Sequence, residues 1–273
     1  TIVKMTTRIE NKEKVIWITG ASSGIGKATA LAFAQKGYKM LLTALEADLL
    51  EEVQQVALQL GSPQVVCLPF DLSKLEELPM LADRAWEQFG RIDIFYNNAG
   101  ISQRGTTVET DMQVIHKVMN VDYYAPVILT KSILPKMLQQ GYGQLAVTTS
   151  IAGKFGFPLR SAYCSAKHAL YGFYETIQAE YYSQNIRVTI VCPGRVQTNI
   201  SINALEKNGQ RHGVMDQGQA NGITAEKAGR QICKAIESQK REVLIGSKEL
   251  MMVYVKRFFP ALAAKIARHI SNM

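Results

Sequence analysis

Short apolar runs alternate with longer amphipathic stretches along most of the chain. The early apolar runs are nearly continuous, which is typical of strands that are covered on both faces of a parallel sheet. The seven runs lie at residues 15–19, 39–43, 65–70, 92–96, 145–149, 188–191 and 243–245. The alternation therefore predicts an α/β fold, with a doubly wound (Rossmann) seven-stranded parallel sheet and helices on both of its faces.

The same alternation defines one catalytic domain over residues 12–247. Residues 1–11 then form an N-terminal extension, and residues 248–273 form a basic amphipathic C-terminal tail. Within the domain, segment 199–222 is rich in Asn, Gln and Gly and has little periodicity. We expect it to be a mobile loop with at most a short helix.

The composition narrows the class of protein. Apolar residues make up 47% and charged residues 20% of the chain, which is typical of a globular enzyme rather than of a disordered segment. The four cysteines form no Cys-x-x-Cys pair, and no histidine is spaced to complete a zinc site, so we expect free thiols and no metal. No apolar stretch is long enough to cross a bilayer, and the first residues lack a signal-peptide core, which favours a cytoplasmic location. The net charge of +8 is explained well enough by a phosphate-bearing cofactor, and no nucleic-acid partner is expected.

Three glycines follow the first predicted strand. Gly20, Gly24 and Gly26 stand between that strand and the next helix. Glycine lets a backbone turn pass against a pyrophosphate because no Cβ intervenes, and the N-terminus of the following helix offers free N–H groups to the phosphate. A tight turn without a ligand is the alternative, but the position directly after the first strand favours a nucleotide site.

Tyr163 and Lys167 are four residues apart and share one face of a predicted helix. A free phenol has a pKa of about 10, and a nearby ammonium lowers that pKa by favouring the phenolate. The pair is therefore a candidate acid/base, although either residue alone would more often be a packing residue. The four histidines have no nucleophile partner that would indicate a Ser-His-Asp triad.

Four motifs resemble those of the short-chain dehydrogenases/reductases, in the same order, within residues 12–247. They are Thr-Gly-Ala-Ser-Ser-Gly-Ile-Gly at 19–26, Asn-Asn-Ala-Gly at 97–100, Tyr-Cys-Ser-Ala-Lys at 163–167 and Pro-Gly at 193–194. The resemblance implies an oxidoreductase that uses NAD(P)(H) to interconvert a secondary alcohol and a ketone. It also implies the catalytic set Asn120, Ser150, Tyr163 and Lys167. Tyr163 would pass the proton, Ser150 would hold the substrate oxygen, and Asn120 would hold a water behind Lys167.

The resemblance further implies cofactor contacts in the turns that follow the strands. Asp71 would accept a hydrogen bond from the adenine amino group, although it and Ser73 are also suited to capping the next helix. The backbone of Val196 and the hydroxyl of Thr198 would hold the nicotinamide carboxamide. The implied set is Gly20, Ser22, Ser23, Gly24, Ile25, Gly26, Asp71, Leu72, Asn98, Ala99, Gly100, Tyr163, Lys167, Pro193, Gly194, Val196 and Thr198.

The choice between NAD and NADP is usually made at the end of the second strand, where an acid pairs with the ribose hydroxyls and an Arg accepts the 2′-phosphate. Thr43, Ala44 and Leu45 include neither. Because no carboxylate there repels a phosphate, and Lys27 and Thr43 are available to bind one, the sequence favours NADP over NAD. Glu46, one residue further on, argues in the other direction.

The substrate site is expected at Ser150, Ile151, Ala152 and Tyr163, among largely apolar loops, which favours an uncharged or lipophilic carbonyl compound. Arg160 and Arg195 could bind an acid group, but surface positions are favoured for both. Pairing through long helices, here 110–139 and 163–184, is common in the family and implies a homodimer or homotetramer.

The tail at 248–273 holds five Lys or Arg residues against one acid. One helical face carries Leu262, Ala263, Ile266, Ala267 and Ile270, and the other carries Lys265, Arg268 and His269. Packing on protein is the favoured interpretation, and contact with an anionic membrane surface is the alternative. Two alternatives to an enzyme are a catalytically silent nucleotide-binding sensor or scaffold, and a membrane-surface protein that acts through this tail.

Overall fold

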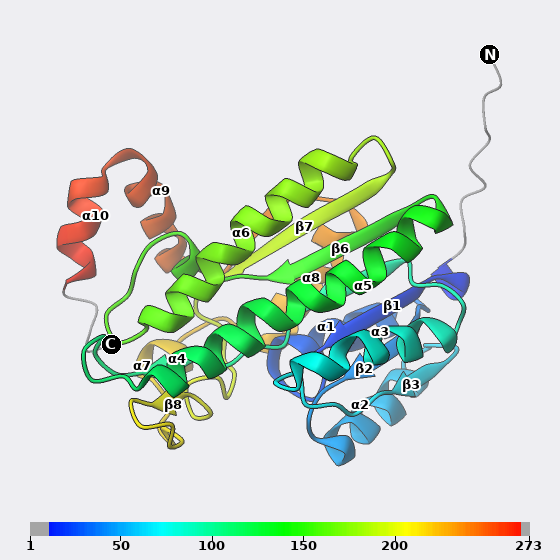
Figure 1. The fold of residues 1–273 in the computed structure, drawn as a ribbon, viewed down its shortest axis with the longest axis horizontal. Helices are drawn as coiled ribbons and strands as arrows, with labels where there is room; N and C mark the ends of the chain where they lie inside the picture. Colours follow the sequence, from blue (N-terminus) through cyan, green and yellow to red (C-terminus); the bar gives the residue numbers. More distant parts are fainter. Residues whose placement is uncertain (1–10, 269–273) are drawn as a thin grey trace.

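The computed structural model describes residues 11–268 and shows a parallel sheet between two layers of helices (Figure 1). The strand order is β3-β2-β1-β4-β6-β7-β9, and each neighbouring pair is parallel. The strands are β1 (Val15–Thr19), β2 (Lys39–Thr43), β3 (Val65–Cys67), β4 (Ile94–Asn97), β6 (Gly143–Thr148), β7 (Ile186–Pro193) and β9 (Glu242–Ile245). The doubly wound seven-stranded fold predicted from the sequence is confirmed.

The helices pack on both faces of this sheet because its strands are apolar on both sides. Trp17 of β1 points into one core and stacks on Phe95, with the ring centroids 4.3 Å apart, whereas Ile16 and Ile18 point into the other core. The first core lies under α3 (Leu78–Glu87), α5 (Ala125–Gln140) and α6 (Ser161–Tyr181). The second core lies under α1 (Gly24–Ala34), α2 (Ala47–Gln59) and α8 (Ala225–Glu237).

β1 and β2 have their predicted bounds, β4, β6 and β9 differ by one or two residues, and other segments differ more. β3 ends at Cys67 rather than at residue 70, although Leu68 still donates a hydrogen bond to Leu42 of β2 and Phe70 donates one to Ala44, just after β2. β7 is longer than predicted, at eight residues. The helix predicted over 110–139 is instead α4 (Met112–Met119), a π-helical turn (Asn120–Tyr124) and α5.

Segment 199–222 contains more structure than the sequence indicated. It carries β8 (Leu205–Glu206), which pairs in parallel with β5 (Gln103–Arg104) as a separate small sheet, and the predicted short helix, α7 (Gln217–Ala220). After β9 the chain forms a hairpin of α9 (Met251–Phe258) and α10 (Pro260–Ala267), which projects from the domain in Figure 1. Within the described residues, each helix is too short or too polar to span a bilayer.

Candidate active site

The turns that follow β1, β4, β6 and β7 meet at one edge of the sheet. Parallel strands end at the same edge, so β1 leads into Gly20, β4 into Asn98, β6 into Ser150 and β7 into Gly194. The chain reverses its direction along the sheet between β1 and β4, and such a switch point is where doubly wound sheets bind ligands. The motif residues identified from the sequence are thus brought together.

The glycine turn after β1 has a backbone conformation and close contacts that leave no room for side chains. Gly20 and Gly24 have φ angles of +64° and +52°, which side chains rarely allow. A Cβ on Gly20 would lie 2.7 Å from the Ala99 Cα, and a Cβ on Gly26 would lie 1.9 Å from the Gly20 carbonyl oxygen. The Asn98 amide fixes the turn by donating to the carbonyls of Thr19 (3.1 Å) and Gly20 (3.2 Å).

The N-terminus of α1 faces this turn. Its N-cap residue, Ser23, makes no side-chain capping bond, so the first N–H groups of the helix are available to a ligand. Thr198 lies on the turn as well, since a Cβ on Gly24 would approach the Thr198 methyl to 3.0 Å. The glycine turn and the uncapped N-terminus of α1 fit the pyrophosphate of a nicotinamide dinucleotide. The adjacent Thr198 hydroxyl fits its carboxamide.

Two carboxylates lie at the adenosine end predicted from the sequence. Glu46 accepts a hydrogen bond from the Ser22 hydroxyl of the glycine turn at 3.0 Å. Asp71 accepts from the backbone N–H and the hydroxyl of Ser73, at 2.9 and 2.7 Å. These bonds close a turn before the next helical segment, whose N-cap residue is Lys74, so Asp71 does not cap that segment.

The remaining predicted cofactor residues border the same edge. The Thr19 hydroxyl accepts from the backbone N–H groups of Asn98 (3.0 Å) and Ala99 (3.2 Å) and so holds the turn after β4. The Pro193 carbonyl accepts from Ser150 at 3.4 Å. Leu72 and Val196 are buried, and Ile25, Gly100 and Gly194 are partly buried.

Helix α6 brings the acid/base candidates to the turn after β6. Lys167 is buried, its Nζ lies 5.5 Å from the centroid of the Tyr163 ring, and it donates to the Thr148 carbonyl at 3.1 Å. The Ser150 hydroxyl lies beside the Tyr163 side chain, where it lowers the pKa of the phenol, and it accepts from the Ala152 N–H at 3.1 Å. The three side chains Ser150, Tyr163 and Lys167 thus form one cluster.

A fourth side chain, Asp122, contacts this cluster, and the sequence had not identified it. The Asp122 Oδ2 lies 3.0 Å from the Lys167 Nζ, and its Oδ1 accepts the Ile101 N–H at 2.7 Å. Asn120 is only partly buried and makes no side-chain hydrogen bond within residues 11–268. Asp122 lies in the π-helical turn Asn120–Tyr124, whose hydrogen bonds span five residues. The family resemblance had implied Asn120, two residues earlier, for the place behind Lys167. The one signal in the sequence was a carboxylate within an otherwise apolar stretch, Val-Asp-Tyr-Tyr.

Burial and charge act on these groups in opposite directions. Burial raises the pKa of Tyr163, the Lys167 ammonium lowers it, and Asp122 raises it again, so that it lies above its ordinary value. Burial lowers the pKa of Lys167, but Asp122 and Tyr163 together outweigh burial and raise that pKa. Burial also raises the pKa of Asp122, against the effect of Lys167. The sequence predicts a Tyr163 pKa lowered by the Lys167 ammonium and does not identify the opposing carboxylate of Asp122.

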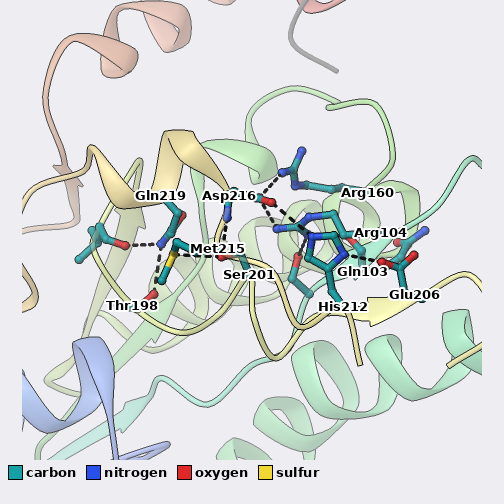
Figure 2. A network of polar contacts seen from close by, with 12 residues as sticks. Gln103, Arg104, Arg160, Thr198, Ser201, Glu206, His212, Met215, Asp216 and Gln219 are labelled. Atoms are coloured by element: carbon teal, nitrogen blue, oxygen red, sulfur yellow. Dashed lines mark hydrogen bonds and ion pairs between the residues drawn. The ribbon is translucent and has the colours of Figure 1, made fainter. Parts of the chain in front are cut away.

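A second charged cluster lies at the N-terminal end of α6 (Figure 2). Arg104 and Arg160 both contact the Asp216 Oδ2, at 2.6 and 2.9 Å. Arg160, for which a surface position was favoured, has a side chain that is only 18% exposed. Desolvation raises the pKa of Asp216, but the two guanidinium groups outweigh it and hold the pKa below its ordinary range. We call Arg104, Arg160 and Asp216 the rim clamp.

The rim clamp fastens loop 199–222 to the catalytic helix. Gln103, next to Arg104, accepts the Ala162 N–H at 2.9 Å, one residue before Tyr163. Three residues after Asp216, Gln219 donates to the Thr198 hydroxyl at 3.1 Å and to the Val196 carbonyl, just before the loop begins (Figure 2). The loop therefore connects the predicted carboxamide contacts to the start of α6.

The predicted substrate residues Ile151 and Ala152 are buried in the turn after β6. Ile151 packs with Phe155 and with the inner face of α9, including Met252 and Val253. Glu249 secures the start of this segment, because its Oε1 accepts the N–H groups of Arg195 (2.8 Å) and Ser247 (3.0 Å). The beginning of the predicted tail therefore packs on the turn that carries the predicted substrate residues.

The chain resembles known proteins in both sequence and structure. Residues 14–209 match the short chain dehydrogenase family. The dehydrogenase/reductase SDR family member 7B of Xenopus laevis is 38% identical over 256 residues, which are 91% of this chain and 79% of that protein.

Two solved structures are similar to this one. An alcohol dehydrogenase of the archaeon Thermococcus sibiricus, complexed with 5-hydroxy-NADP, is 26% identical with a TM-score of 0.74, and the match covers 86% of this chain and 97% of that chain. A short-chain dehydrogenase/reductase of Burkholderia phymatum in complex with NAD has a TM-score of 0.81 over 93% of this chain and 96% of its own. At 23% identity, the latter shows a likeness of fold alone.

Proposed function

The chain belongs to the short-chain dehydrogenase/reductase family, and from this premise we propose that it is an enzyme that interconverts a ketone and a secondary alcohol with a nicotinamide cofactor. The observation that carries the proposal is the convergence of Ser150, Tyr163 and Lys167 beside the glycine turn. Residues that bind nucleotide and residues that move a proton thus meet at one edge of the sheet.

Each of these side chains has a distinct task. The Ser150 hydroxyl holds the substrate oxygen, and the Tyr163 phenol exchanges a proton with it. Lys167 supplies a positive charge beside the phenol and donors for the ribose hydroxyls. When bound, the nicotinamide supplies or accepts the hydride. The glycine turn, Asn98 and Thr198 would hold this cofactor in place.

For the cofactor, we propose NAD rather than the NADP that the sequence alone favoured. Glu46 lies 20 residues after Gly26 and is hydrogen-bonded to Ser22 of the glycine turn. An acid at about this separation pairs with the ribose hydroxyls of NAD, and its charge repels a 2′-phosphate. Titrating the protein with NADH and NADPH, followed by the fluorescence of the reduced nicotinamide, tests this choice. Tighter binding of NADPH than of NADH would contradict the proposal. Glu46→Gln should reduce the difference in affinity between NADH and NADPH.

For the substrate, we propose an apolar carbonyl compound. Ile151, Ala152 and Phe155 line the turn beside Ser150 and are all buried apolar residues. The direct test is a panel of apolar aliphatic and aromatic ketones with the preferred reduced cofactor, followed by loss of its absorbance. Turnover of apolar ketones in preference to charged ones supports the proposal. Tight cofactor binding with no turnover would instead favour the silent sensor or scaffold.

For the α9–α10 hairpin, we propose contact with an anionic membrane surface. Its outer face exposes Tyr254, Phe258 and Phe259 at 52%, 69% and 63%, and Lys256 and Arg257 are exposed beside them. Apolar side chains among basic ones suit the interface of a bilayer with acidic headgroups. Deleting the tail would also remove the packing of α9 on the turn that carries the predicted substrate residues, so point substitutions make the cleaner test.

The hairpin proposal is tested by co-sedimentation with vesicles of phosphatidylcholine, with and without phosphatidylserine. The full chain should sediment with the acidic vesicles, and the double substitution Phe258→Ser and Phe259→Ser should remain in solution. Tyr182→Ser removes an aromatic side chain of similar exposure, 50%, at the end of α6 and should behave as the unchanged protein. Equal sedimentation of all three proteins would overturn the proposal.

A further inference from the structure

The Lys167 ammonium is in contact with a carboxylate as well as with a phenol. Asp122 is fully buried, and one of its oxygens lies 3.0 Å from the Lys167 Nζ. The charged or titratable groups facing Lys167 within the described residues are Asp122, from the π-helical turn, and Tyr163, from α6. The groups facing Tyr163 are Lys167, Asp122 and Cys164, together with the Ser150 hydroxyl.

The local packing leaves space for this ion pair. A Cβ on Gly100 would lie 3.0 Å from the Asp122 Oδ2 and 3.2 Å from the Lys167 Nζ, so only a residue without a side chain leaves the pair unobstructed. The Asp122 Oδ2 is completely buried and accepts no hydrogen bond apart from its ion pair with Lys167 in the described part of the chain. One oxygen of Asp122 therefore holds the turn after β4, and the other is directed at the lysine.

A carboxylate in this place changes what the lysine does to the phenol. A lone ammonium would stabilise the phenolate form of Tyr163. The negative charge of Asp122 cancels much of the effect of the Lys167 charge on Tyr163. The protein interior screens charges poorly, so the effect of Asp122 on Tyr163 is large. In keeping with this geometry, the pKa of Tyr163 lies above its ordinary value, with burial as the largest cause.

We propose that Asp122 is a positioning residue that neutralises Lys167 and thereby keeps Tyr163 a neutral phenol, so that the site serves carbonyl reduction better than alcohol oxidation at neutral pH. The inference rests on the proposed function and deepens it by assigning a direction. In reduction, the carbonyl carbon gains a hydride from the reduced nicotinamide, and the carbonyl oxygen gains the proton of the Tyr163 hydroxyl. The products are the secondary alcohol, the oxidised cofactor and a phenolate that regains its proton from solvent. Oxidation requires that phenolate at the start.

The first test measures the ionisation of Tyr163 without any substrate. Tyrosinate absorbance is followed from neutral pH to alkaline unfolding, and the curve of the same protein carrying Tyr163→Phe is subtracted. Asp122→Asn should lower the pH at which Tyr163 ionises by about one unit or more, because it leaves the Lys167 charge uncompensated. Asp122→Ser is the second variant, in case the amide disturbs the turn.

Asp93→Asn is the matched control, because Asp93 is also buried but pairs with Arg91 just before β4, at the opposite edge of the sheet. It should leave the ionisation of Tyr163 unchanged. The proposal is overturned if Tyr163 ionises at the same pH in the Asp122 variants as in the unchanged protein, or ionises in none of them before unfolding.

The second test uses the most active ketone of the panel and its alcohol. In Asp122→Asn, the pH at which kcat/KM for oxidation reaches half of its alkaline plateau should fall by about one unit. An unshifted profile contradicts the role of Asp122. If no ketone or alcohol is turned over, the proposed function fails, and the spectroscopic result still decides what Asp122 does to Tyr163.

Discussion

Two aspartates neutralise cations at α6, but their surroundings differ. Asp122 comes from the π-helical turn between α4 and α5, and it and Lys167 have side chains that are 0% and 3% exposed. Asp216 comes from loop 199–222, and the side chains of the rim clamp are 9 to 18% exposed. Both sites balance charge on the same helix. In our proposal, the Asp122–Lys167 pair controls the protonation of Tyr163. The rim clamp instead fixes the position of loop 199–222.

The largest difference should appear in stability. Asp122→Ala should lower the free energy of unfolding by about 3–5 kcal/mol, because it leaves Lys167 buried and unpaired. Asp216→Ala should cost about 1–2 kcal/mol, because water can reach the guanidinium groups that it leaves. Urea unfolding followed by circular dichroism measures both. Equal losses of the free energy of unfolding would contradict this difference between the interior ion pair and the rim clamp.

An intermediate effect is expected on substrate binding. Asp216→Ala should raise the KM for a ketone about tenfold, or ~1.4 kcal/mol, with a smaller change in kcat, since the loop that it releases borders the site but carries no acid/base residue. Glu109→Ala is the control, because it breaks an exposed ion pair with Lys207 of the same loop and should have little effect. A fall in kcat with unchanged KM would place the rim clamp in the chemistry instead.

The smallest effect is a difference in pH dependence. The Asp216 pKa is held below its ordinary value, so the stability that the rim clamp contributes is complete above about pH 4 and is lost as the pH falls through the lowered pKa. The Lys167 pKa is raised, so the contribution of its charge is lost only as the pH rises above about 10.4. Amide hydrogen exchange should therefore show loop 199–222 opening first in acid and turn 120–124 first in alkali. The reverse order would contradict the assignment.

The sequence predicted those parts of the molecule that depend on local patterns. The seven strands, the glycine turn and the Tyr163–Lys167 pair follow from hydrophobic periodicity and spacing, and the sheet is confirmed in full.

The parts that could not be predicted depend on contacts between distant segments. Arg104 and Asp216 are 112 residues apart, and segment 199–222 has no periodicity that would place them together. Asp122 was not identified because Asn120 was chosen from the family resemblance, and nothing in the local sequence shows that the π-helical turn directs Asp122 at Lys167. The hydrogen bond between Ser22 and Glu46 likewise joins two turns that the sequence alone does not align.

The most direct test of the account is the rate of hydride transfer in a single turnover with Tyr163→Phe. Loss of the phenolic proton donor should slow ketone reduction by about 10²- to 10⁴-fold, while NADH binds as tightly as before. Tyr182→Phe, at the exposed end of the same helix, should react at the rate of the unchanged protein. Hydride transfer by Tyr163→Phe at that same rate would contradict the central claim that this tyrosine is the acid.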